Sequence, residues 1–151
     1  MDDKLASLLE SHKLELAQTV ITNKVYTTLT TTNSKEMLAK SIEIVEAIAT
    51  YLRTCDPLPY RIFVTEFSQQ LFQQGLSVEG FQEVGQVLID NMKNLVEQKF
   101  NNPTLYHSKT DYKRQLEIIL RLTNVIAVTA RITITTGKKE LVTKSGLSLA
   151  S

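Results

Sequence analysis

The sequence predicts an all-α protein, a bundle of about five main helices around one core. Apolar residues recur at intervals of three and four over most of the 151 residues, which is the period of a helix that buries one face. Residue types that cap or end helices separate these periodic segments. Only RITITTG, residues 131–137, alternates like a strand, and it has no second strand with which to pair. We therefore expect helix there too.

The first helix is predicted from a stripe of residues at helical spacing: Leu5, Leu8, Leu9, His12, Leu16 and Val20. The pattern ends in YTTLTTTNS, residues 26–34, where β-branched threonines lower helix propensity and indicate a loop or a frayed end. Asn33 and Glu36 then have the spacing of a capping box. A second helix follows, and its apolar face consists of Leu38, Ile42, Val45, Ile48, Ala49 and Leu52.

Two prolines mark the start of a third helix. Asp56, Pro57 and Pro59 form this boundary, since proline fits the first turn of a helix, where its missing N–H is not needed. The apolar residues that this helix should bury are Tyr60, Phe63, Val64, Phe67 and Leu71. It should stop at Gly75.

QGLSVEGF, residues 74–81, predicts a very short connection between the third and fourth helices. Gly75 suits the left-handed position that ends a helix, and Ser77 is a natural N-cap for the next one. Leu76 and Phe81 have the spacing of a hydrophobic staple across that cap. We expect the two helices to form a hairpin.

The fourth helix should bury one stripe of residues: Phe81, Val84, Leu88, Met92, Leu95 and Val96. It should end near Phe100, before the segment Asn-Asn-Pro at 101–103. Gly80 falls in its first turn, where glycine costs little. Gly85 lies deeper, where glycine costs about 1 kcal/mol relative to alanine. We expect Gly85 to permit the close approach of a neighbouring helix.

The last helix is predicted from about Asp111, after a cap-like Ser108, to the neighbourhood of Thr135. It has two apolar faces. The first consists of Leu116, Ile119, Leu120, Ala127, Ala130 and Ile134, and the second of Ile118, Leu122, Val125 and Ile132. A helix with two apolar sides is either central in its domain or shared with a partner. Residues 138–151, KKELVTKSGLSLAS, are expected to be a polar tail or an interdomain linker after a domain that spans residues 1–137.

Composition limits the classes of partner. The net charge of +1 is too small to indicate nucleic acid or an anionic membrane as the main partner. Cys55 is the only cysteine, which excludes an internal disulfide and favours a reduced, cytoplasmic setting. The N-terminus lacks the basic start and apolar run of a signal peptide, and no stretch of ~18 consecutive apolar residues indicates a membrane span.

The sequence contains no phosphate-binding loop, dinucleotide fingerprint, H-E-x-x-H or G-x-S-x-G motif, so we expect no catalytic residue, metal or cofactor. His12 is either a hydrogen-bonded residue at the edge of a core or interface, or a pH-sensitive or ligand-contacting group. His107, in a segment before the last helix, would ligate haem only if that segment folded inward. Cys55 is either an inert thiol at a helix end, a redox thiol, or the anchor of a thioether-linked chromophore.

Residues 56–96, DPLPYRIFVTEFSQQLFQQGLSVEGFQEVGQVLIDNMKNLV, resemble the N-terminal sensor domain of RsbR-type stressosome proteins, the RsbT co-antagonist N-terminal family. The resemblance is carried by a helix that ends in Gln74-Gly75, an apolar residue, the Ser77 cap and a long apolar-striped helix. The preceding helix, which ends in YLRTCDP, also fits in length and place. Such domains often carry a tryptophan near the end of the first helix, and this chain has none.

This resemblance implies a globin-like fold without haem and a non-enzymatic input module that forms a homodimer. It implies a last helix that continues toward a C-terminal output domain such as STAS, so the chain is either a fragment of a longer regulator or a stand-alone module. The implied partners are other stressosome-type regulatory proteins or a kinase that phosphorylates threonine. An unidentified small apolar ligand is compatible with such a domain.

We therefore expect a regulatory sensor or scaffold domain of bacterial stress signalling or anti-sigma-factor antagonism. Its expected dimer interface lies on the first and last helices, at Leu5, Leu9, His12, Ile118, Leu122 and Val125. The alternative is a haem- or bilin-binding globin-like sensor that uses His107 or Cys55. An enzyme would require a cleft that gathers titratable groups with shifted pKa values.

Overall fold

The computed structural model describes residues 3–23, 34–100 and 106–150, with side chains for residues 3–23, 35–100 and 109–136. The described residues form six α-helices and no strand, which confirms the all-α prediction. The helices are α1 (Asp3–Ser11), α2 (Lys13–Ile21), α4 (Ser34–Thr54), α5 (Leu58–Gln73), α6 (Val78–Lys99) and α7 (Tyr106–Ala150). The segment RITITTG lies within α7 and is helical.

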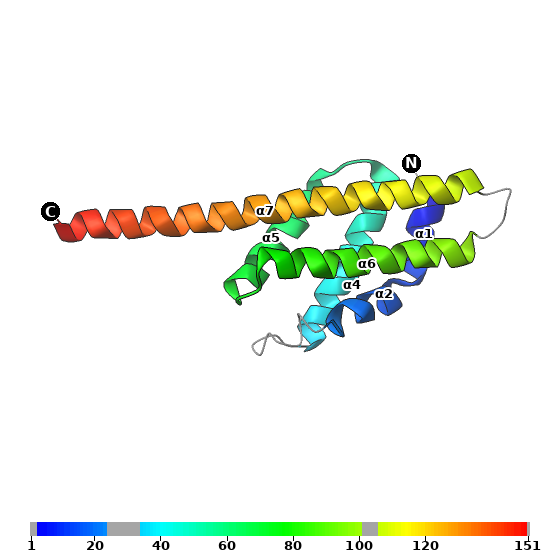
Figure 1. Ribbon diagram of the computed structural model, residues 1–151, viewed down its shortest axis with the longest axis horizontal. Helices are drawn as coiled ribbons and strands as arrows, with labels where there is room; N and C mark the ends of the chain where they lie inside the picture. Colours follow the sequence, from blue (N-terminus) through cyan, green and yellow to red (C-terminus); the bar gives the residue numbers. More distant parts are fainter. Residues whose placement is uncertain (1–2, 24–33, 101–105, 151) are drawn as a thin grey trace.

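The six helices form a bundle from which one helix projects. Figure 1 shows α6 and α7 side by side, running in opposite directions, with the C-terminal part of α7 extending beyond the other helices. α7 packs against α5 and α6, and α4 packs against α1, α2 and α5. All six helices contribute to one continuous apolar core.

The predicted apolar faces correspond well to the core. On α6, all six residues of the predicted stripe are buried. On α4 the buried face is turned slightly from the prediction, because Leu38 and Ile42 are only partly buried whereas Met37, Ser41 and Ile44 are buried. Ser41 has no exposed surface, and its hydroxyl donates to the Met37 carbonyl oxygen at 2.7 Å. A buried serine that satisfies itself within its own helix leaves no apolar signal in a sequence.

The connection between α5 and α6 confirms its prediction in detail. Gly75 has φ +104°, its N–H donates to the Phe72 carbonyl, and the Leu76 N–H donates to the Leu71 carbonyl. This pair of hydrogen bonds is a Schellman motif, which satisfies carbonyls that a helix end would leave unpaired. The Gly80 N–H donates to Ser77 Oγ at 3.0 Å, so Ser77 is the N-cap of α6.

The prediction of one long first helix is wrong, because the chain breaks at His12 into α1 and α2. His12 has φ −115° and ψ 16°, outside helical geometry. In an unbroken helix the Leu8 carbonyl would accept the His12 N–H. Instead it accepts the Ser11 hydroxyl at 3.0 Å and the His12 Nδ1–H at 3.1 Å, and the His12 N–H turns to Leu9. Side chains that take over a helical carbonyl bend or end a helix.

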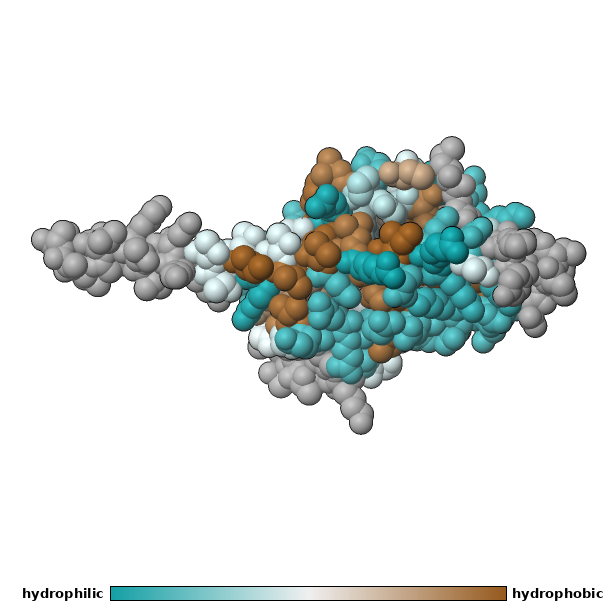
Figure 2. Space-filling model, turned by 45° about the horizontal axis from the view of Figure 1, so that its top comes forward, coloured by the Kyte–Doolittle hydropathy of each residue, from teal (hydrophilic) through white to brown (hydrophobic). Residues whose placement is uncertain are grey.

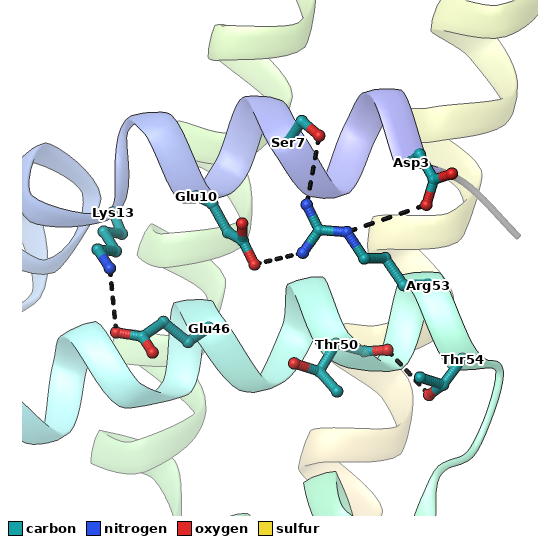
Figure 3. Close-up of polar contacts among 8 residues, drawn as sticks. All are labelled: Asp3, Ser7, Glu10, Lys13, Glu46, Thr50, Arg53 and Thr54. Atoms are coloured by element: carbon teal, nitrogen blue, oxygen red, sulfur yellow. Dashed lines mark hydrogen bonds and ion pairs between the residues drawn. The ribbon is translucent and has the colours of Figure 1, made fainter.

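A guanidinium holds α1 against the end of α4 (Figure 3). Arg53 of α4 donates to Glu10 and to Ser7 of α1, and it forms a longer ion pair with Asp3 at 3.9 Å. The Arg53 hydrogen bond holds the pKa of the Glu10 carboxyl below its ordinary value, against a smaller opposing effect of burial. These groups are partly exposed, so the contacts contribute little to the stability of the fold. Their main effect is to fix the position of α1 against α4.

Both predicted ends of the last helix are wrong. α7 begins at Tyr106, so Ser108 lies inside the helix and is not its N-cap. α7 also continues past Thr135 to Ala150, through most of the segment expected to be a tail or linker. The division into a domain ending at residue 137 and a linker after it stays a prediction. The proposed cap at Asn33 lies outside the described residues.

Gly85 allows a test of how α6 packs against α7. An added Cβ would meet only Leu120 Cδ1, at 3.7 Å, which is ordinary van der Waals contact. The expected close approach of a helix backbone is therefore wrong, and alanine fits. We predict that Gly85→Ala raises the free energy of unfolding by about 1 kcal/mol through helix propensity. Chemical denaturation measures this change.

Gly85→Leu is the contrasting variant, because a branched side chain would overlap Leu120 and the surrounding core. It should lower the free energy of unfolding by about 1–3 kcal/mol. Equal stability of the alanine and leucine variants would contradict this account of α6–α7 packing.

Candidate interaction surface on the last helix

The two apolar faces predicted for the last helix have different environments. On the first face, Leu116, Ile119, Leu120, Ala127 and Ala130 are buried, and Ile134 packs partly buried against them. On the second face, Ile118 is 50%, Val125 60% and Ile132 60% exposed. The bundle therefore uses one face of α7 and leaves the other at its surface.

The exposed residues repeat every seven positions, as the sequence shows. Leu122 and Thr129 fall between them, four residues after Ile118 and Val125 respectively, and alternate steps of four and three describe one stripe along a helix. Leu122 is partly buried and Thr129 is exposed. We call these five residues the α7 stripe. Apolar residues at this spacing form the seam of a coiled coil.

Ion pairs with α6 fix how α7 is turned about its own axis. Lys93 of α6 donates to Glu117 of α7 at 2.5 Å. Glu97 of α6 accepts from Lys113 and from Lys109 of α7, the latter at 3.0 Å. The lysine hydrogen bonds hold the pKa values of the Glu97 and Glu117 carboxyls below their ordinary range, against a smaller effect of desolvation.

A buried hydrogen-bonded pair fixes α7 against α5. The Thr123 hydroxyl of α7 donates to the Ile119 carbonyl at 2.7 Å, so the Tyr60 hydroxyl of α5 is the donor in its bond to Thr123. Tyr60 is 2% exposed, and burial raises the pKa of its phenol far above the ordinary range. Farther along α7, the Arg131 guanidinium lies 5.8 Å from the centre of the Phe72 ring. Together these contacts leave Ile118, Val125 and Ile132 of the α7 stripe facing outward.

The surface confirms that apolar side chains reach solvent along this helix. Figure 2 shows brown, hydrophobic atoms along the course of α7, interrupted by teal, hydrophilic ones. Val128 of α7, outside the α7 stripe, is also exposed, at 40%. The other exposed large apolar residues belong to other helices: Leu14 of α2, and Leu58 and Ile62 of α5. An exposed apolar row on one helix is a common mark of an interaction site.

The same helix is apolar enough to cross a membrane by length and composition alone. The segment Lys109–Thr136 has a window of 18 residues with mean hydropathy 1.5, and 33% of that window is buried inside the bundle. Core helices of soluble proteins give the same pattern. Arg121 and Arg131 also fall in this segment, and each arginine at the centre of a bilayer costs about 2.5–3.5 kcal/mol on insertion scales.

The predicted dimer interface is thus only partly at the surface. Leu5 and Leu9 have no exposed surface and belong to the core, so their assignment to an interface is wrong. They face α4 because α1 packs against that helix. His12 is partly exposed at the α1–α2 break, where its ring contacts Leu8 and Ser11. Ile118, Leu122 and Val125 belong to the α7 stripe.

The two candidate ligand-binding residues lie at helix ends. Cys55 is exposed, directly after α4, and its φ of +57° places it in the left-handed conformation that ends a helix. Its N–H donates to the Tyr51 carbonyl at 2.8 Å, so its visible role is to end α4. His107 lies in the first turn of α7, and its side chain is outside the described part of the chain. Within that part, His, Cys, Asp and Glu form no cluster able to hold a metal ion.

Comparisons with known proteins add no relative: no protein-family model, curated protein or solved structure matches this chain. The resemblance to RsbR-type sensor domains therefore rests on the residues quoted for it.

The ion pairs between α6 and α7 predict an acid-sensitive fold. Because the folded-state pKa values of Glu97 and Glu117 lie below the ordinary 4.5, the ion pairs stabilise the fold above about pH 4.5. This stabilisation is lost as pH falls through the folded pKa values. We expect the melting temperature to fall as the pH drops below about 4.5, and to fall less in Glu117→Gln.

Glu83→Gln is the control, since Glu83 is an exposed residue of α6 that makes neither of these ion pairs. Thermal unfolding followed by circular dichroism measures both variants. Glu83→Gln should show the same drop in melting temperature with acid as the unchanged chain. If Glu117→Gln also showed that same drop, the ion pairs would not orient α7 in solution.

Proposed function

We propose that this chain is a non-enzymatic regulatory module that forms a homodimer through the α7 stripe. The observation that carries the proposal is the outward row of Ile118, Val125 and Ile132, each at least half exposed, on a helix whose other face is core. Two such rows bury each other when two copies of α7 lie side by side. Burial of a whole isoleucine or valine side chain contributes about 1.5–3 kcal/mol.

A second copy of the chain fits this surface for a geometric reason. The seven-residue repeat of the α7 stripe matches the repeat of a two-stranded coiled coil, in which identical seams pack against each other. Thr129 adds a polar position to the seam, and polar seam residues restrict the register and number of strands at some cost in stability. An isologous interface of this kind is the commonest form of homodimer.

Signal transfer follows from the continuity of α7. The helix runs without a break from the core to its projecting end, so a shift of its buried part displaces the far end as well. A domain that follows such a helix would be held as one of two copies. The resemblance to RsbR-type sensor domains supports this role and suggests a STAS-like output domain, stressosome-type proteins or a kinase as partners, and a cytoplasmic setting.

The first test compares two isoleucines with the same exposed fraction. Ile118 of the α7 stripe and Ile62 of α5 are each 50% exposed. We predict that Ile118→Ser, or Val125→Ser, weakens dimerisation at least tenfold, whereas Ile62→Ser leaves it unchanged. Sedimentation equilibrium across micromolar concentrations measures the association constant. A monomeric unchanged chain, or equal effects of Ile118→Ser and Ile62→Ser, would refute the proposed interface.

Membrane association through α7 is a second candidate, favoured by the hydropathy of Lys109–Thr136. It requires the buried face of α7 to leave α5 and α6, or the α7 stripe to lie on the lipid surface. Flotation of the purified chain with neutral phosphatidylcholine vesicles separates the two functions. The homodimer proposal predicts that the chain stays with the aqueous fraction, and comigration of the chain with vesicles that Ile118→Ser abolishes would favour the membrane.

The haem- or bilin-binding alternative rests on His107 and Cys55. An absorption spectrum after incubation with haem or biliverdin tests it directly. A Soret or bilin band that disappears in His107→Ala or Cys55→Ala would favour this alternative over a module without a chromophore.

A further inference from the structure

A small cavity of about 20 Å³ lies in the centre of the bundle. Its lining comes from α2, α4, α5, α6 and α7, and includes Val20, Phe67 and Leu88. Two buried hydroxyl residues, Ser41 and Thr123, also line it. A cavity of 10–15 Å³ by this measure holds one water molecule, so this one takes a single molecule of about that size.

The two hydroxyls give the cavity a defined hydrogen-bonding character. The Ser41 hydroxyl hydrogen is already donated to the Met37 carbonyl, and the Thr123 hydroxyl hydrogen to the Ile119 carbonyl. Each oxygen retains acceptor capacity, although Thr123 uses part of its own for Tyr60. The remaining lining side chains are apolar. The cavity therefore offers hydrogen-bond acceptors and no side-chain donor.

The lining contributed by α6 includes one glycine, Gly85. It lines the cavity, and a Cβ at this position would meet no closer neighbour than Leu120 Cδ1 at 3.7 Å. Packing therefore does not demand glycine here, and a helix interior disfavours it. Leu120 does not line the cavity, so a methyl group at residue 85 would lie toward Leu120 and not among the lining side chains.

We propose that this cavity is a binding site for one small neutral molecule that donates hydrogen bonds, with water as its resident in the purified protein. The bound molecule donates to Ser41 Oγ and Thr123 Oγ1 and so bridges α4 and α7. Thr123 is the residue that also accepts from Tyr60, so the occupant touches the contact that orients α7 against α5. The site does not depend on whether two copies of α7 associate.

The experiment detects a long-lived water by nuclear Overhauser and rotating-frame transfer from water to the methyl groups of Thr123 and Val84, which both line the cavity. The unchanged chain should show these cross-peaks with the sign of a bound water. Val20→Ile keeps both hydroxyls and adds a methyl group to a side chain that lines the cavity, so it should lose them. Retention of the cross-peaks in Val20→Ile would assign them to exchanging hydroxyl protons and overturn the proposal.

Two further variants address the hydrogen bonds. Ser41→Ala should shorten the residence time of the water at least tenfold. Thr133→Val is the control, because Thr133 donates to its own helix as Thr123 does but is exposed and does not line the cavity. It should leave the cross-peaks unchanged.

Xenon binding tests whether the cavity is dry. If the unchanged chain showed no water cross-peaks but xenon shifted the resonances of the Val84 and Thr123 methyl groups, the cavity would be dry and the proposal wrong. The cavity lies within one copy of the chain, so its test is independent of dimerisation. Absence of the bound water would leave the homodimer proposal standing, and a monomeric chain would leave the water-site proposal standing.

Discussion

The rotation of α7 about its own axis determines most of what this molecule presents to its surroundings. On one side of α7, Thr123 accepts a hydrogen bond from the buried Tyr60 of α5. On another side, Glu117 of α7 pairs with a lysine of α6, and Glu97 of α6 pairs with two lysines of α7. A helix with two apolar faces can bury either of them. These polar contacts select the face with Leu116 and Ile119, and they leave Ile118, Val125 and Ile132 in solvent.

The proposed dimer interface, the proposed water site and the proposed route of signal transfer all involve α7. Its inner face closes the core, its Thr123 lines the central cavity, and its outer face carries the α7 stripe. Its C-terminal part leaves the bundle without interruption. A change in the cavity would act on Thr123, and through the rigid helix on the position of the projecting end. The arrangement is suited to regulation because a small internal change and a distant partner would share one element.

Sequence reasoning recovered what depends on periodicity and on local caps. The buried face of α6, the Schellman end at Gly75 and the Ser77 cap follow from residue types a few positions apart. It missed two features that periodicity does not encode. One is the break at His12, where the Ser11 hydroxyl and the imidazole replace a backbone N–H at the Leu8 carbonyl. The other is the burial of Ser41, which depends on how the helices pack. Sequence reasoning also could not separate core from interface, so Leu5 and Leu9 were assigned to a partner although α4 buries them.

The most direct test of the central claim places one thiol in the middle of the α7 stripe. Cys55 is first replaced by glycine, which suits its left-handed backbone, and Val125→Cys is then introduced. Val125 lies midway between Ile118 and Ile132, so it meets its own copy whether the two helices run parallel or antiparallel. Under mild oxidation we predict a disulfide-linked dimer at micromolar concentration, and an Ile62→Cys chain that forms no disulfide-linked dimer. Equal crosslinking of the two chains, or none at Val125, would contradict it.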